Sequence, residues 1–143
     1  MLIRPAHADD VPELVVLLDQ WGHPQPAAVV AAQLADWSQT PNAAYLVAET
    51  GGALVGAVAV AATPHLGRPG RSARIVGLVV RDGQRRTGVG AALVGAAEEL
   101  ARDWNCDVLE LTSSRARDAA HPFYRALGYQ DQSDHHARYL REL

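Results

Sequence analysis

Hydrophobic positions near the start of the chain recur with the period of an α-helix. This spacing predicts one helix that begins at Asp9 or Asp10 and ends at Leu18, and a second over 27–37. Glycine and proline in 22–26 separate the two helices. The positions expected to face the core are Val11, Leu14, Val15, Leu17 and Leu18 in the first helix and Val30, Leu34 and Trp37 in the second.

Three shorter stretches of the first half have the β-branched, apolar composition of strands. They cover 2–4, 44–49 and 54–62, and the glycines in 50–53 indicate a hairpin between the last two. The following residues, 64–72, are rich in proline and glycine. We therefore interpret 64–72 as a loop and as a candidate substrate-access loop.

The second half alternates strands with helices. The pattern predicts a strand over 74–80, a helix over 88–103, a strand over 108–112, a helix over 118–127 stopped by Gly128, and terminal strands from Tyr129 onward. The resulting order, β-α-α-β-β-β-α-β-α-β, favours an α/β (α+β) fold in which a mixed sheet carries helices on both faces.

Length and composition narrow the possible functions. A chain of 143 residues fits one domain, 1–143. The net charge of −3, without long blocks of one sign, gives no reason to expect a nucleic-acid partner. Cys106 is the only cysteine, which excludes an internal disulfide and a cysteine-based zinc site, and the adjacent His135 and His136 lack further metal-ligand spacing. We expect no metal.

No stretch of the sequence has the features of a membrane or export segment. Residues 1–5 lack the apolar run of a signal peptide, and the apolar run 57–62 is far too short to cross a bilayer. We therefore expect a cytoplasmic protein without a membrane partner.

The segment 78–93 runs from an apolar strand through a basic turn with glycines into a helix. Exposed N–H groups at a helix start bind anionic oxygens, and glycines allow a phosphate to approach them. A Walker A loop is unlikely because Val89 and Gly90 stand where its lysine and hydroxyl residue belong. A Rossmann fingerprint is also disfavoured, because Leu93 occupies the position of its third small residue.

Two motifs in this order resemble a known family. Arg85-Arg86-Thr87-Gly88-Val89-Gly90 resembles the acetyl-CoA pyrophosphate loop of the GNAT superfamily of N-acetyltransferases. Ala120-His121-Pro122-Phe123-Tyr124-Arg125-Ala126-Leu127-Gly128-Tyr129 is similar to the second signature of that superfamily. The resemblance implies a mostly antiparallel sheet of six to seven strands, flanked by about four helices.

The resemblance also implies an activity. We expect direct transfer of an acetyl group from acetyl-CoA to a primary amine of a small molecule or peptide, without a covalent enzyme intermediate. The alternative is a non-catalytic acyl-CoA-binding or regulatory module of the same fold, because carboxylates found in many relatives are missing at Val76-Gly77 and Thr112. We also expect a homodimer, since a terminal strand over 137–143 offers an edge for pairing and members of the superfamily that this chain resembles often pair there or across a helix face.

Site residues follow from the resemblance, position by position. Tyr124 matches the tyrosine that protonates the departing thiolate, whereas the general base is open among Glu110, His65, a water relay and, in a supporting role, His121. Arg117 stands where relatives often place asparagine and is assigned to a CoA phosphate. The predicted cofactor-binding residues are Leu78, Val79, Val80, Arg85, Arg86, Thr87, Gly88, Val89, Gly90, Ala91 and Arg117.

Overall fold

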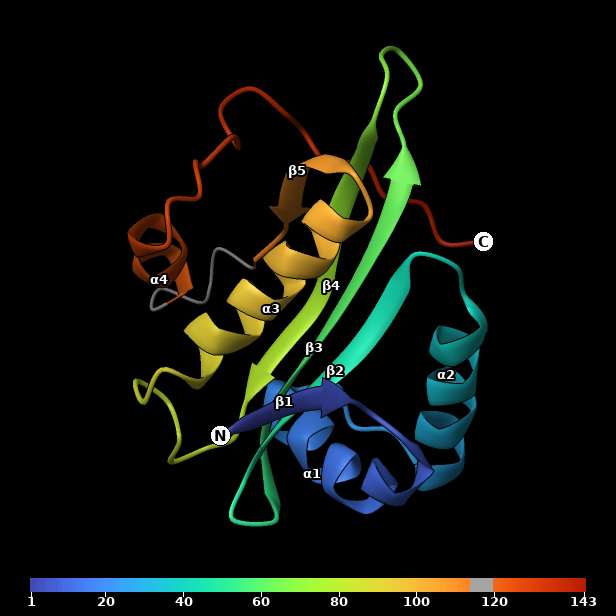
Figure 1. Ribbon diagram of the computed structural model, residues 1–143, viewed down its shortest axis with the longest axis vertical. Helices are drawn as coiled ribbons and strands as arrows, with labels where there is room; N and C mark the ends of the chain where they lie inside the picture. The colour runs from blue at the N-terminus through green and yellow to red at the C-terminus, as the bar shows by residue number, and fades with distance from the viewer. Residues whose placement is uncertain (114–119) are drawn as a thin grey trace. The chain divides into compact units, whose positions relative to one another are not determined.

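The computed structural model describes residues 1–113 and 120–143. It forms two compact units, Met1–Thr112 and Ser113–Leu143, which are treated separately below. The elements, in chain order, are β1 (Leu2–Pro5), η1 (Ala8–Asp10), α1 (Val11–Trp21), α2 (Ala27–Gln39), β2 (Ala43–Thr50), β3 (Ala53–Pro64), β4 (Arg71–Val80), α3 (Val89–Asp103), β5 (Cys106–Leu111) and α4 (Ala120–Ala126) (Figure 1).

The first unit is built on one sheet with strand order β1-β2-β3-β4-β5. Neighbouring strands are antiparallel except β4 and β5, which are parallel. Parallel neighbours need a crossover connection, and α3 provides it. This arrangement confirms the predicted mixed sheet with helices, apart from the number of strands.

The two faces of the sheet are covered by different helices. A methyl group added at Gly56 would meet Leu93 and Val89 of α3, whereas one added at Gly77 would meet the indole of Trp21 at the end of α1. Helix α1 contacts α2, β3 and β4, and α2 contacts β2. The core between these two helices and the sheet includes Leu14, Leu17, Val30, Leu34, Val47, Ala57 and Val79.

The expected terminal strands are absent. The described sheet has five strands rather than six to seven, and residues 129–143 form none. Every residue from Gln130 to the end of the described chain is exposed, so no apolar face is available to hold a strand against a core. The strand over 137–143 on which the homodimer expectation rests is therefore not present.

Other boundaries shift by a few residues. Helix α1 continues to Trp21, where Gly22 ends it in the left-handed region at φ +92°, and β5 begins at Cys106 rather than at Val108. The expected loop over 64–72 is mostly a hairpin tip, since β3 reaches Pro64 and β4 begins at Arg71. Among the residues described, no helix combines the length and apolarity needed to cross a membrane.

The start of the chain is fixed by an ion pair beneath β1. Both guanidinium nitrogens of Arg4 donate to the carboxylate of Asp10 at 2.8 Å, and the Arg4 Nε donates to Glu49 at 3.1 Å. The Asp10 side chain is only 8% exposed and also accepts the His7 N–H at 3.0 Å. The hydrogen bonds from Arg4 hold the pKa of Asp10 below its usual 3.8.

Asp10→Asn is expected to lower the free energy of unfolding at pH 7 by about 2 kcal/mol, because Arg4 loses its charged partner. The folded-state pKa of Asp10 is depressed, so its contribution is present above pH 3.8 and is lost as the pH falls through the folded value. Denaturant unfolding of both proteins between pH 7 and pH 2 checks this. Asp9→Asn is the control, since Asp9 is 95% exposed, and an equal loss there would contradict the prediction.

Candidate active site

Strand β4 carries a β-bulge near its middle. Val60 pairs with Ile75 and Ala59 pairs with Gly77, so Val76 is the extra residue, and it is 55% exposed. A bulge shifts the phase of the strand and is common next to binding sites. Here the shift places Gly77 on the face covered by α1.

One edge of β4 lacks a partner strand beyond the bulge. The parallel pairing with β5 ends at Ile75 and Leu111, whereas the antiparallel pairing with β3 continues to Val80. In the described part of the chain, no strand pairs with 76–80 on the β5 side. The peptide groups that point to that side are therefore available for a ligand.

The direction of each peptide group follows from the register. The N–H of Arg81 donates to the carbonyl oxygen of Val55 on β3 at 2.8 Å. Because successive residues of a strand present their peptide groups to opposite edges, Val79 also points to β3, whereas Leu78 and Val80 point to the unpaired edge. Leu78, Val79 and Val80 are predicted together as cofactor-binding residues. The structure shows that only Leu78 and Val80 present their peptide groups to the unpaired edge.

The segment after β4 is anchored to α1 and β3 before the chain turns. The Arg81 Nε donates to the Leu54 carbonyl at 2.6 Å, and the Glu13 carboxylate accepts the Leu54 N–H at 2.5 Å and an Arg81 nitrogen at 3.4 Å. The Asp82 N–H donates to Gln20 at 2.8 Å. These contacts fix the residues that lead into the predicted phosphate loop, 85–91.

The loop itself reverses direction through left-handed backbone conformations. Gly83 has φ +84°, Arg86 has φ +63° and Gly88 has φ +87°. The Arg85 guanidinium lies 2.9 Å from the Asp82 carboxylate, and the Thr87 hydroxyl donates to the backbone carbonyl of Gln84. Both side chains thus hold the turn, which leaves backbone groups as its main anion donors.

Helix α3 begins at Val89 with Gly88 as its N-cap, and no side chain caps this end. The first turn therefore offers backbone N–H groups together with the positive end of the helix dipole. A methyl group built on Gly88 has nothing within 4 Å, so the space before the helix is open, whereas Val89 and Gly90 are buried. The helix start follows directly after the unpaired edge of β4.

Glu110 is held in an ion pair on the face of the sheet that α1 covers. Its carboxylate lies 3.4 Å from an Arg74 nitrogen, and Arg74 also donates to the Thr112 hydroxyl at 3.1 Å. Arg74 pairs in register with Ala61 and Glu110, which places all three on the same face as Ala59 and Gly77. Glu110 therefore faces the same side as the bulge, with its side chain 61% exposed.

The His65 side chain is bound to Asp107 near the start of β4. Its Nε2 lies 2.6 Å from Asp107 at the start of β5, and Arg68 lies 3.3 Å from the same carboxylate. The hydrogen bond from His65, followed by the charge of Arg68, lowers the pKa of Asp107. This cluster ties the hairpin tip to β5, and it lies away from the bulge along the strand.

The second unit is ordered around Tyr124. Helix α4 ends in a Schellman motif, because the Tyr129 N–H donates to the Tyr124 carbonyl, the Gly128 N–H donates to Arg125, and Gly128 has φ +92°. The rings of Tyr124 and Tyr129 meet edge to face at 6.2 Å. The predicted stop at Gly128 is confirmed, whereas Arg117 lies outside the described residues.

The sequence analysis does not identify a cavity of about 250 Å³ between α1, α2 and the sheet. It is lined by Leu18, Trp21, Gln33, Asp36, Trp37, Tyr45 and residues 57–59 and 76–79. Trp37 meets Tyr45 edge to face at 6.3 Å, and burial raises the pKa of the Tyr45 phenol. The cavity reaches the bulge, so a molecule held there lies beside the unpaired edge of β4.

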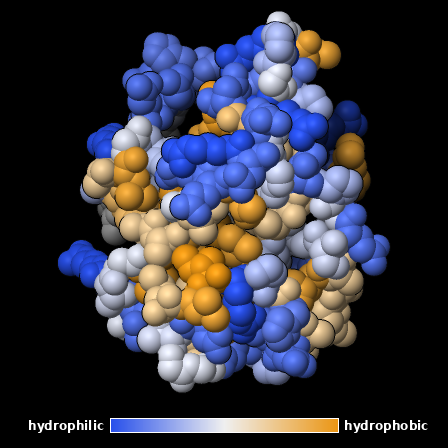
Figure 2. All heavy atoms as spheres, in the orientation of Figure 1, coloured by the Kyte–Doolittle hydropathy of each residue, from blue (hydrophilic) through white to orange (hydrophobic). Residues whose placement is uncertain are grey.

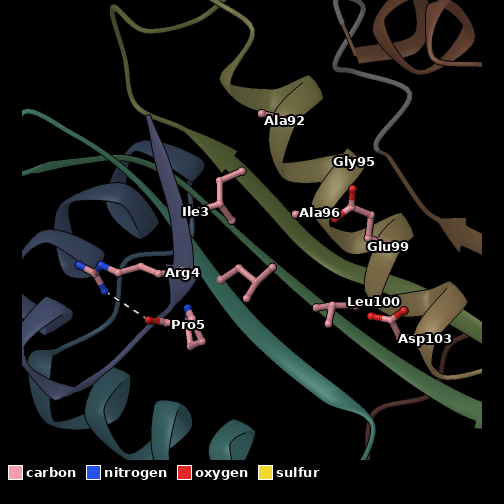
Figure 3. Close-up of a pocket in the computed structure, with 10 residues that line it drawn as sticks. Ile3, Arg4, Pro5, Ala92, Gly95, Ala96, Glu99, Leu100 and Asp103 are labelled. Carbon is pink, nitrogen blue, oxygen red and sulfur yellow. Dashed lines mark hydrogen bonds between the residues drawn. The ribbon is translucent and has the colours of Figure 1, made fainter.

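A second groove, of about 570 Å³, lies on the opposite face between β1 and α3 (Figure 3). Apolar atoms gather on this face where β1 crosses it, with hydrophilic atoms above them (Figure 2). Its lining includes the carboxylates of Glu99 and Asp103, whereas Arg4 is already bound to Asp10 and Glu49. These two carboxylates repel phosphate, which makes this groove unsuitable for a nucleotide.

Within residues 1–113 and 120–143, no group of three or more His, Cys, Asp or Glu side chains is arranged to hold a metal ion.

Comparison with known proteins places this geometry in a family. Residues 11–129 match the model of the acetyltransferase (GNAT) family. The chain is 33% identical over 113 residues to an aminoalkylphosphonate N-acetyltransferase of Salmonella typhimurium, an alignment that covers 79% of this chain and 69% of that protein.

Solved structures share the fold of this chain. A transcriptional regulator from Bacillus halodurans has a TM-score of 0.87 at 26% identity, with 99% of each chain covered. A GNAT family acetyltransferase from Staphylococcus aureus shares the fold with a TM-score of 0.82 at 19% identity, covering 99% of this chain and 98% of that one. The chain therefore belongs to the GNAT acetyltransferase family and is an acyltransferase.

Proposed function

We propose that the protein transfers an acetyl group from acetyl-CoA directly to a primary amine. The observation that carries this proposal is the continuous path from the unpaired edge of β4 to the uncapped start of α3. The pyrophosphate binds the N–H groups of residues 85–91, and the acyl-pantetheine arm lies along the edge of 76–80. Arg86 adds positive charge at the loop.

The chemistry needs an oxyanion site and an acid. The amine nitrogen attacks the thioester carbonyl carbon, a C–N bond forms, and the carbonyl electron pair moves onto oxygen. The N–H groups of Leu78 and Val80 are the donors available to that oxygen, and such a donor contributes roughly 3 kcal/mol in other enzymes. Collapse of the intermediate breaks the C–S bond, and the Tyr124 hydroxyl gives its proton to the departing thiolate.

Release of free CoA thiol from acetyl-CoA over a library of primary amines tests the proposal directly. We expect at least one amine to release thiol with saturation kinetics. Acetyl-CoA binding without thiol release on any amine would instead favour the acyl-CoA-binding module of the same fold.

Glu110 is the proposed general base, acting directly or through water. It shares a face of the sheet with Gly77, and Arg74 keeps its carboxylate oriented over that face. The amine must lose a proton before or during attack, and a carboxylate on this side can accept it.

Glu110→Gln is expected to lower kcat/KM about a hundredfold near pH 7, because an amide cannot accept the proton. The loss should shrink at higher pH, where more of the amine is already neutral. Glu98→Gln is the control, since Glu98 is ion-paired with Arg102 on α3 at 3.6 Å. Equal small losses in both variants, with an unchanged pH profile, would leave Glu110 as a surface ion-pair partner only.

A cytoplasmic location and a homodimer remain predictions, as does the assignment of the whole chain to a single domain.

A further inference from the structure

The cavity between α1, α2 and the sheet is shaped for an apolar body. Its floor consists of small residues from neighbouring strands, because Ala59 pairs with Gly77 and Ala57 pairs with Val79. Its walls are the aromatic rings of Trp21, Trp37 and Tyr45 together with Leu18. Small floor residues create the space, and the rings give it flat, apolar sides.

Space at the floor is limited by a close contact. A methyl group on Gly77 would lie 2.9 Å from the Trp21 ring, so the indole rests directly on the strand after the bulge. An occupant must therefore be slender where it reaches β4. An unbranched chain that ends in an amine meets that requirement, because its nitrogen carries no bulky substituent.

The charge of the cavity has one sign. Asp36 is the charged side chain in its lining, beside the polar Gln33 on α2, and none of the described lining residues is arginine or histidine. His23 stacks on Trp21 with ring centroids 4.3 Å apart but does not line the cavity. All thirteen basic residues of the chain are arginine, and Arg81, which lies closest in sequence after β4, is bound to Glu13.

This combination selects for positive charge in the occupant. Aromatic faces attract ammonium groups, and a carboxylate at the rim adds a specific partner. An anionic group would face Asp36, at a cost in binding, because Arg74 on the same face of the sheet does not line the cavity and is already paired with Glu110. The reactive amine must lie at the β4 end, so Asp36 acts on the opposite end of the molecule.

We infer that the acceptor is an unbranched primary amine with an apolar body and a second cationic group, held by Asp36 at α2 while the first amine reaches β4. This inference rests on the proposed acetyl transfer. It also separates this chain from its Salmonella relative, which is named for an acceptor that carries a phosphonate anion.

Four probes of similar length test the inference: cadaverine, pentylamine, aminovalerate and aminopropylphosphonate. Thiol release from acetyl-CoA gives kcat/KM for each. Asp36 is exposed, so we expect cadaverine to exceed pentylamine by roughly threefold, the size of one solvent-screened ion pair, and both anionic amines to be poorer than pentylamine. Direct binding of each probe is read from tryptophan fluorescence, since two of the three tryptophans line the cavity.

Asp36→Asn should reduce the preference for cadaverine over pentylamine about threefold, in both kcat/KM and binding. Asp19→Asn removes the same charge from an exposed position on α1 outside the cavity and should keep the preference. An unchanged preference in Asp36→Asn, or an anionic amine as the best acceptor, would overturn the inference while leaving acetyl transfer intact. Thiol release with none of a broad amine library would overturn the proposed function, and fluorescence would then still report whether Asp36 selects cadaverine.

Discussion

Tyr124→Phe is expected to lower kcat about a hundredfold while changing the Kd of acetyl-CoA less than twofold. The phenol proton is needed only as the C–S bond breaks, so its loss removes an interaction made in the transition state and little ground-state binding. The measurement is thiol release at saturating acetyl-CoA, together with calorimetric binding of acetyl-CoA in the absence of an amine.

Tyr129→Phe provides a matched control for this variant. Tyr129 lies at the end of the same helical motif, and its ring meets that of Tyr124 at 6.2 Å. Both substitutions remove one hydroxyl and leave the edge-to-face contact in place. If Tyr124→Phe retained full turnover, or if both variants lost turnover equally, the hydroxyl of Tyr124 would have a packing role and the thiolate would take its proton from elsewhere.

Local sequence signals predict the elements of this fold well. The helix after the phosphate loop begins at Val89 beside the expected Gly88, and Gly128 ends α4 as predicted. Both outcomes depend on glycine conformations within one turn of chain, and that information is contained in a few adjacent residues. The prediction of terminal strands was wrong for the opposite reason. A strand needs a neighbouring strand and a buried face in addition to its own alternation of apolar and polar residues.

Features that depend on pairing between distant strands could not be predicted from the sequence. The bulge at Val76 exists only relative to Ala59 and Val60 on β3, and the neighbouring Gly77 signals an irregular strand without identifying the extra residue. The same register decides that Leu78 and Val80, and not Val79, present peptide groups to the open edge. The motif resemblance indicates the right strand, and only the register identifies its available atoms.

The acceptor cavity illustrates a second limit. Trp37 is correctly predicted to lie on the inner side of its helix, yet its role as a cavity wall depends on Ala59 and Gly77 being small on strands far away in sequence. A glycine in a strand often marks a close approach by another group, and Gly77 was the available signal. Its partner, the Trp21 ring, could not be assigned without the packing of α1 on the sheet.

Gly88→Ala is expected to raise the Kd of CoA at least tenfold, the largest effect on cofactor binding that we predict. Gly88 has φ +87°, a conformation that costs an alanine about 1 kcal/mol, so the chain relaxes and moves the first N–H groups of α3. The added methyl group also enters the open space in front of those groups, where the pyrophosphate binds. Gly90 is a less informative position because it is buried, and a larger side chain there would disturb packing.

Gly83→Ala separates backbone strain from ligand binding. Gly83 has φ +84° and, like Gly88, nothing within 4 Å of an added methyl group, but it lies before the phosphate loop. Both variants should therefore lose similar thermal stability, whereas only Gly88→Ala should weaken CoA binding. Isothermal titration with CoA and thermal unfolding of the two proteins give both quantities. Equal affinities would mean that the pyrophosphate does not bind at the start of α3, and the path along β4 would then have to end at a different anion site.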